Sequence, residues 1–90
     1  MGEITLSTLE VGKWGSVGEI ALTGSIRRRL QELGFVRGTP VQSLYDAPSG
    51  SPRAFGIRGA VIALRRDNAR EIFVRPLPEE DPARPDSFHP

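Results

Sequence analysis

One segment of this chain, residues 25–38, has the spacing of an amphipathic helix, and no other segment has it convincingly. Its apolar residues Ile26, Leu30 and Leu33 recur at i, i+4 and i+7, which places them along one side of a helix. A helix of about ten residues is marginal alone in water, so this stripe must pack against another part of the chain. We expect that other part to be a sheet.

Both ends of this helix carry typical capping residues. Ser25 is suited to the N-cap position, where its hydroxyl would accept a hydrogen bond from a free N–H of the first turn. Gly34 follows the last apolar residue of the stripe, at a point where a left-handed backbone commonly ends a helix. The sequence therefore predicts a short helix with defined ends.

The remaining segments of the first 75 residues have the composition of strands and turns. Five strands are predicted, at residues 16–22, 39–47, 53–57, 60–64 and 72–74. Gly18 is the expected place of a bulge in the first strand, and residues 65–70 are polar enough for one turn of helix or a loop. With the helix between the first and second strands, this pattern predicts a mainly β fold. It would be a small, partly open five-stranded β-barrel whose helix plugs one end.

The clearest turn lies between the second and third predicted strands. Its five residues all favour turns: Pro48, Ser49, Gly50, Ser51 and Pro52. Because an extended segment lies on each side, we predict a hairpin loop with Gly50 at positive φ. The tip of such a loop should be exposed.

Composition divides the chain into one domain, residues 1–75, and a tail, residues 76–90. A domain of this size buries about 60–65% of its unfolded-chain surface, so no large substrate cavity is expected. The domain holds 11 Lys or Arg against 7 Asp or Glu, a net charge of +4, whereas the proline-rich tail has a net charge of −3. A charge of +4 is modest for a nucleic-acid binder, so no nucleic-acid partner is predicted. The acidic tail should be disordered or extended.

The residues that usually carry chemistry are missing or scattered. Cysteine is absent, which excludes disulfides, thiolate zinc sites, iron–sulfur ligands and cysteine nucleophiles. The one histidine, His89, is second from the end of the tail, where it cannot anchor a metal site or a catalytic base. The carboxylates of residues 1–75 are dispersed, and no close pair among them suggests general acid–base chemistry. We predict no enzyme activity, no cofactor and no metal site.

Targeting and membrane features are also weak. No run of residues approaches the roughly 20 apolar residues of a membrane span, and the first residues lack the basic start and apolar core of a leader. We expect an unprocessed, soluble chain without direct membrane insertion, and the lack of cysteine fits a reducing cytoplasm.

Three arginines stand at the start of the predicted helix. Arg28 and Glu32 should face outward at i, i+4, while Arg27 and Arg29 flank the apolar stripe, so all three guanidinium groups should reach solvent or a partner. Cations at a helix N-terminus oppose the macrodipole, at a cost of about 0.3–1 kcal/mol each. A solvated surface explains them, and a surface for an acidic partner is the functional alternative.

Several short motifs follow one another in a fixed order between residues 6 and 74. They are Leu9-x-x-Gly12, Gly15-x-Val17, Ile20, Arg29-Leu30-x-x-Leu33-Gly34-Phe35, Gly38-Thr39-x-Val41, Ala47-Pro48-x-Gly50-x-Pro52 and Gly59-x-x-Ile62-Ala63-Leu64-Arg65. In order and spacing this series resembles the bacterial ferrous iron transport protein A (FeoA) family. The resemblance implies a cytoplasmic SH3-like barrel, without enzyme activity, that serves as an accessory to the membrane ferrous iron transporter FeoB, whose cytoplasmic part binds GTP.

Two exposed features are the predicted partner-binding surfaces: the helix edge with Arg27 and Arg28, and the hairpin loop of residues 48–52. Two residues depart from the family pattern near these surfaces. Ser51 stands where an acidic residue is common, and Arg37 where proline is common before the following glycine. Contacts made by these loops should therefore differ from those of other members.

Three alternatives accompany this interpretation. The same SH3-like module resembles the C-terminal domain of metal-dependent transcriptional repressors, and a free-standing regulator of that kind would borrow DNA binding from a partner. A peptide-binding adaptor would need a continuous aromatic groove, but the aromatic residues stand far apart in the sequence: Trp14, Phe35, Tyr45, Phe55 and Phe73. Weak self-association is the third, because small barrels with exposed strand edges often associate.

Overall fold

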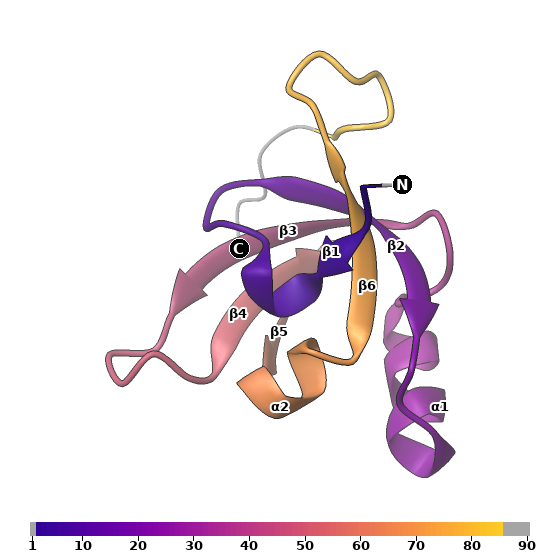
Figure 1. Cartoon of the computed structure of the whole chain (residues 1–90), viewed down its shortest axis with the longest axis vertical. Coiled ribbons are helices and arrows are strands. Elements are labelled where there is room, and N and C mark those ends of the chain that lie inside the picture. The colour runs from indigo at the N-terminus through magenta and orange to yellow at the C-terminus, as the bar shows by residue number, and fades with distance from the viewer. Residues whose placement is uncertain (1, 86–90) are drawn as a thin grey trace.

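The computed structural model describes residues 2–85, and its strands form one antiparallel sheet (Figure 1). The elements in chain order are β1 (Ile4–Thr5), the 3-10 helix η1 (Leu6–Thr8), β2 (Trp14–Ile20), α1 (Gly24–Leu33), β3 (Pro40–Asp46), β4 (Arg53–Ile57), β5 (Ala60–Leu64), α2 (Arg66–Ala69) and β6 (Ile72–Leu77). The strand order is β1-β6-β2-β3-β4-β5. The fold is therefore mainly β, as predicted, with one longer helix.

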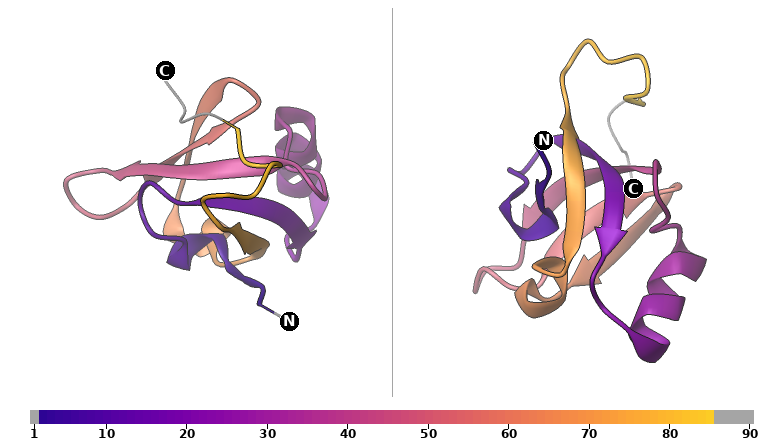
Figure 2. Two further views of the ribbon diagram at one scale, coloured as in Figure 1. Left: turned by 90° about the horizontal axis from the view of Figure 1, so that it is seen from above. Right: turned by 45° about the vertical axis from the view of Figure 1, so that its right-hand side comes forward.

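The sheet curls around the core without closing, because β1 and β5 are its two outer strands and do not pair with each other (Figure 2). The core is formed by apolar side chains from almost every element, the largest being Phe35, Phe55, Leu6 and Leu30. The prediction of five strands was wrong by one. The missed strand, β1, has only two residues, too few for any periodicity to show in the sequence.

The predicted strand limits hold best for the central hairpins. β4 and β5 have the predicted bounds, whereas β2 begins two residues earlier and ends two residues earlier than predicted. Trp14 and Gly15, which precede the predicted strand, pair with β3 on one side and β6 on the other. The register between β2 and β6 shifts between Val17 and Ile20, which confirms an irregularity at Gly18.

The last strand, β6, extends beyond its prediction. Pro76 lies opposite Gly15 of β2, and the buried Leu77 lies opposite Trp14. Both residues were assigned to the tail, yet they belong to the sheet. The sequence indicated the end of the domain before Pro76 because proline is depleted in strands. Proline, which has no backbone N–H, is nevertheless tolerated at a strand position whose N–H would not donate a hydrogen bond to the neighbouring strand.

Helix α1 begins one residue before the predicted N-cap. Thr23 is the N-cap, no side-chain hydrogen bond caps this end, and Ser25 is inside the first turn. The predicted capping role of Ser25 was therefore wrong. At the other end the prediction is confirmed, because Gly34 has a φ of +118° and the N–H of Phe35 donates to the carbonyl oxygen of Leu30 at 2.9 Å.

The apolar stripe of α1 is buried to very different extents along the helix. Leu30 is 1% exposed, Ile26 is half-buried against the core, and Leu33 is 36% exposed. The helix does not plug the end of a closed barrel. It lies at the open side of the curled sheet, beside the end of β2 (Figure 2). A groove lies between this helix and β5. Because the outer strands of the sheet do not meet, they leave part of the core uncovered between them, and the helix covers that part.

Candidate protein-interaction surfaces

The predicted hairpin loop joins β3 to β4 at one extremity of the molecule (Figure 1). Gly50 has a φ of +92°, as predicted for this turn. The N–H of Ala47 donates to the carbonyl oxygen of Pro52 at 2.9 Å, and the N–H of Gly50 donates to that of Ala47 at 2.8 Å. The peptide bond between Ser51 and Pro52 is cis. Backbone hydrogen bonds thus define the shape of the loop.

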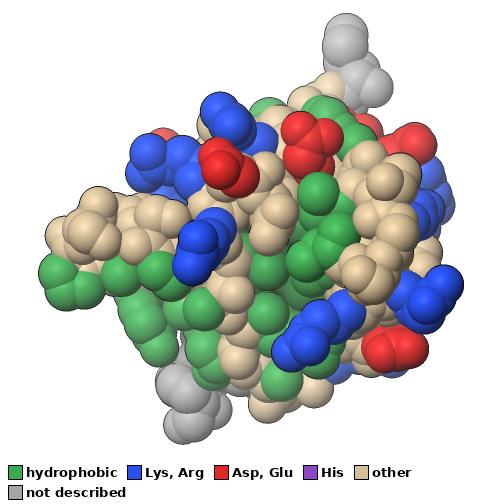
Figure 3. All heavy atoms as spheres, turned by 90° about the horizontal axis from the view of Figure 1, so that it is seen from below, with side chains coloured by type: hydrophobic (Ala, Val, Ile, Leu, Met, Phe, Trp, Pro, Cys, Tyr) green, Lys and Arg blue, Asp and Glu red, His purple; other side chains and the backbone are tan. Residues whose placement is uncertain are grey.

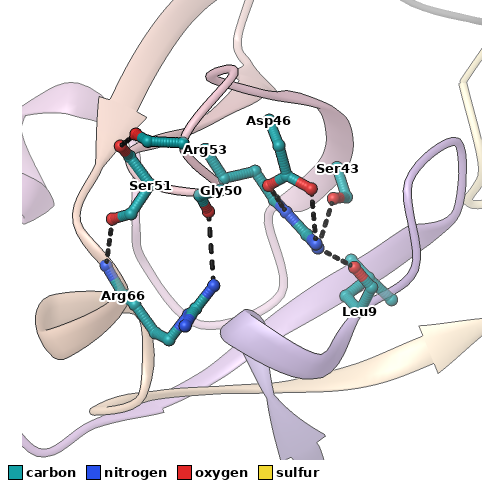
Figure 4. A network of polar contacts seen from close by, with 8 residues as sticks. Leu9, Ser43, Asp46, Gly50, Ser51, Arg53 and Arg66 are labelled. Carbon is teal, nitrogen blue, oxygen red and sulfur yellow. Dashed lines mark hydrogen bonds and ion pairs between the residues drawn. The ribbon is translucent and has the colours of Figure 1, made fainter.

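Side chains from both strands anchor the base of the hairpin (Figure 4). The guanidinium of Arg53 donates to both carboxylate oxygens of Asp46, at 2.7 and 3.2 Å. It also donates to the carbonyl oxygen of Leu9 at 2.6 Å and to the hydroxyl of Ser43 at 3.1 Å. The hydrogen bond from Arg53 lowers the pKa of the Asp46 carboxyl, and this effect outweighs partial burial, which acts in the opposite direction.

A second arginine holds the inner side of the loop. Arg66, at the start of α2, donates its guanidinium N–H to the carbonyl oxygen of Gly50 at 3.3 Å and its backbone N–H to the Ser51 hydroxyl at 3.3 Å (Figure 4). Ser51 occupies the position where the family pattern commonly has an acidic residue, and its hydroxyl here accepts a hydrogen bond. The exposed remainder of the tip is formed by Pro48, Ser49 and Pro52.

The space behind the hairpin is small. A cavity of about 40 Å³ lies among residues that include Ser7, Asp46, Phe55 and Arg66. That volume accommodates a few water molecules, since one water needs roughly 10–15 Å³ by this measure. The space behind the hairpin is therefore too small to enclose a substrate.

The predicted basic edge of α1 is only partly available. Arg27 is half-buried, and its guanidinium donates to the carbonyl oxygens of Ile20 and Leu22, the latter at 3.4 Å. These bonds hold the end of β2 against the first turn of α1, so the prediction that this side chain reaches solvent was wrong. Arg28 and Arg29 are exposed as predicted. The sequence could not show that Arg27 would find carbonyl acceptors seven and five residues before it.

The two predicted surfaces do not form one site. Figure 1 shows the hairpin loop and α1 on opposite sides of the sheet, and the view from above in Figure 2 agrees. A partner that touches both would have to reach around the molecule.

Among the residues that the structure describes, the aromatic side chains do not form a continuous exposed groove. Phe35 and Phe55 are fully buried, Trp14 is 4% exposed, and Tyr45 stands out on β3 with 56% exposed. Within residues 2–85 there is no group of three His, Cys, Asp or Glu that could hold a metal ion, and no helix long and apolar enough to cross a membrane. His89 lies outside the described residues.

A groove that the sequence did not predict separates α1 from β5. Its volume is about 490 Å³, and it is lined by Ile26, Arg29, Leu30, Leu33, Val61, Ile62, Ala63, Leu64, Arg65 and Asn68. Figure 3 shows this lower face of the molecule, where hydrophobic side chains gather and both basic and acidic side chains lie around them. The only feature of the sequence that could have indicated this groove was the uncharged composition of residues 60–64. An uncharged strand is equally compatible with burial under another element, so this composition did not predict a groove.

Comparison with known proteins agrees with this architecture. The model of the FeoA domain family matches residues 4–76, which is nearly the whole of the sheet. The chain belongs to the FeoA family. Among curated proteins no match is found.

Two solved FeoA structures illustrate the likeness. The solution structure of FeoA from Chlorobium tepidum is 34% identical, with a TM-score of 0.80 over 88% of this chain and 75% of that one. The zinc complex of FeoA from Stenotrophomonas maltophilia is 32% identical, with a TM-score of 0.71 over 79% of this chain and 88% of that one. The latter is described as a prokaryotic SH3 domain protein and as a candidate activating factor of ferrous iron transport. The FeoA-family sheet described above is accordingly SH3-like.

The predicted kinship with metal-dependent repressors holds at the level of the fold. A manganese-dependent transcriptional repressor superposes with a TM-score of 0.73 at 20% identity, over 83% of this FeoA-family chain and 42% of the repressor. At that identity the likeness shows the fold alone.

Proposed function

We propose that this protein is a cytoplasmic accessory of bacterial ferrous iron uptake that binds the cytoplasmic part of a FeoB-type transporter, including its GTP-binding domain. The observation that carries the proposal is the FeoA domain match over residues 4–76. The site geometry supports it in one respect: hydrogen bonds from Arg53 and Arg66 hold an exposed loop in a defined shape.

The hairpin tip is the first proposed contact. Arg53 and Arg66 fix its base and its inner side, so Pro48, Ser49 and Pro52 are presented without further ordering of the backbone. A loop that is ordered before binding loses less conformational entropy when it docks. Gly50 and Ser51 contribute by shaping this tip.

Arg28 is the second proposed contact, and it would face an acidic patch of the partner. Arg27 supports this edge indirectly, because its bonds to Ile20 and Leu22 position the first turn of α1. Since the hairpin and α1 lie on opposite sides, the two contacts should act independently.

The test is a pulldown of the full 90-residue protein against detergent-solubilised membranes and against the isolated GTP-binding domain of the cognate transporter. Retention of the transporter supports the proposal. Omitting residues 78–90 in a parallel experiment shows whether the tail contributes while leaving Leu77 in the sheet.

Charge reversal then locates the surface. Arg28→Glu should weaken retention if the helix edge meets an acidic patch, and Arg75→Glu, an exposed arginine on β6, is the matched control. Equal retention of both variants removes the helix edge from the proposal. Capture of a DNA-binding protein in place of the transporter would favour the repressor-related alternative.

A further inference from the structure

The groove between α1 and β5 reaches the free edge of the sheet. Four consecutive residues of β5 line it, from Val61 to Leu64. Successive side chains of a strand point to opposite faces, so a groove lined by all four must run along the strand's edge and not along one face. It therefore exposes backbone as well as side chains.

β5 has one paired side only. Its partner is β4, and no other strand in residues 2–85 pairs with it. In an antiparallel strand every second residue directs its N–H and C=O away from the paired neighbour, so β5 offers unpaired donors and acceptors along the groove.

The usual protections of an edge strand are missing from β5. Its sequence is Ala-Val-Ile-Ala-Leu, without lysine, proline or any charge, and its register with β4 has no bulge. Val61 is 40% exposed, and Leu33 across the groove is 36% exposed. An apolar, uncharged edge of this kind is a template for strand pairing.

The two charged residues that line the groove are both basic. Arg29 and Arg65 line it, no Asp or Glu does, and neither guanidinium forms an ion pair within the described part of the chain. An occupant with acidic residues at its ends would therefore complement the groove, whereas a basic one would be repelled.

We propose that this groove binds an extended segment of a partner protein that adds to the sheet as a strand beside β5. The segment would place alternate apolar side chains against Leu33 and Val61, and acidic residues near Arg29 and Arg65. Main-chain hydrogen bonds to the open edge would supply affinity, and the apolar and acidic side chains would supply specificity. The inference does not depend on the partner being the transporter.

A second copy of this chain fits the same edge less well. The groove lining holds no Asp or Glu, so a second copy that paired through the same edge would bring no carboxylate of its own groove to Arg29 and Arg65. An acidic-ended segment would bring such carboxylates and is the occupant that the charges favour.

The test uses two synthetic peptides with the ¹⁵N-labelled full chain. One has the core Val-Thr-Val-Thr-Val between pairs of Glu, and the other has the same core between pairs of Lys. The Glu peptide should shift the amide resonances of residues 60–64 and of the groove side of α1, and it should slow hydrogen exchange at the outward N–H groups of β5. The Lys peptide should bind at least tenfold more weakly at low salt.

Variants make the test specific. Val61→Glu should weaken binding of the Glu peptide at least tenfold, while Val11→Glu, at an apolar position that is 49% exposed and outside the groove, should change it less than twofold. Reversing both arginines, Arg29→Glu with Arg65→Glu, should make the Lys peptide the better ligand. Native-like spectra of the free variants show that each still folds.

Three results would overturn the inference. The first is that the Glu peptide shifts only amide resonances outside the groove, or none at all. The second is that the two peptides bind with equal affinity. The third is that, without peptide, the amide resonances of β5 shift with protein concentration, which would assign the edge to self-pairing. Failure of the transporter pulldown would leave this outcome untouched, so the two proposals fail separately.

Discussion

Leucines 30 and 33 of α1 offer a direct test of how the helix packs. They lie three residues apart on the same helix, but Leu30 is 1% exposed and Leu33 is 36% exposed. Leu→Ala removes the same three carbon atoms at either position. Any difference in the free energy of unfolding must therefore come from the surroundings.

The structure sets the expected magnitudes. At Leu30 the three carbons are fully buried, so their loss costs about 2.4 kcal/mol in transfer free energy at about 0.8 kcal/mol each. The cavity left behind adds to this, which gives about 3–4 kcal/mol, within the range of buried Leu→Ala changes. At Leu33 solvent already reaches the side chain along the groove, so no enclosed cavity forms and the cost should be about 1 kcal/mol.

Urea unfolding followed by far-UV circular dichroism measures both variants. With a slope of about 1–1.5 kcal/mol per molar urea, Leu30→Ala should lower the midpoint by about 2–4 M and Leu33→Ala by less than about 1 M. Equal losses, or a nearly neutral Leu30→Ala, would mean that α1 packs with another face toward the sheet.

Two further predictions concern single positions, and a third concerns metal binding. Gly34→Ala should cost about 1–3 kcal/mol, because φ is +118° there and a Cβ would lie 2.8 Å from Arg58 Cδ, whereas Gly38→Ala, at φ +91° with nothing within 4 Å, should cost less in the same urea assay. Asp46→Asn should lower stability at neutral pH. Because Arg53 lowers the folded-state pKa of Asp46, its contribution exists above the ordinary carboxyl pKa and is lost as pH falls below about 4, so thermal denaturation of variant and parent should converge in acid. Anaerobic calorimetry should find no stoichiometric micromolar ferrous ion complex of the isolated protein. Finding one would refute the inference drawn from the lack of cysteine in the sequence and of clustered ligands within residues 2–85.

Much of the fold could be predicted because its causes are local. The period of Ile26 and Leu30 identified the helix, and Gly34 identified its end. The turn residues 48–52 placed the hairpin, and the bounds of β4 and β5 followed from it. The FeoA-family motifs, each a turn or core position, extended this local information to the arrangement of the whole domain.

Other features depended on contacts between distant parts of the chain and could not be predicted. The two-residue strand β1 exists only because β6 pairs with it. Trp14 and Pro76 are strand residues because the sheet continues on both sides of β2. Arg27 was counted among the exposed cations, since nothing in the sequence shows that the end of β2 turns its carbonyl groups toward the helix.

The sequence by itself determined the helix, the hairpin, the left-handed glycines Gly34 and Gly50 and the lack of a cysteine site, because each follows from residue type and short-range spacing. Only the tertiary structure decided which arginines of α1 remain free, how deeply each leucine of its stripe is buried, and that β5 is an outer strand beside an apolar groove. Periodicity shows which face of an element is apolar, but the amount of that face that is covered depends on what the rest of the chain places against it.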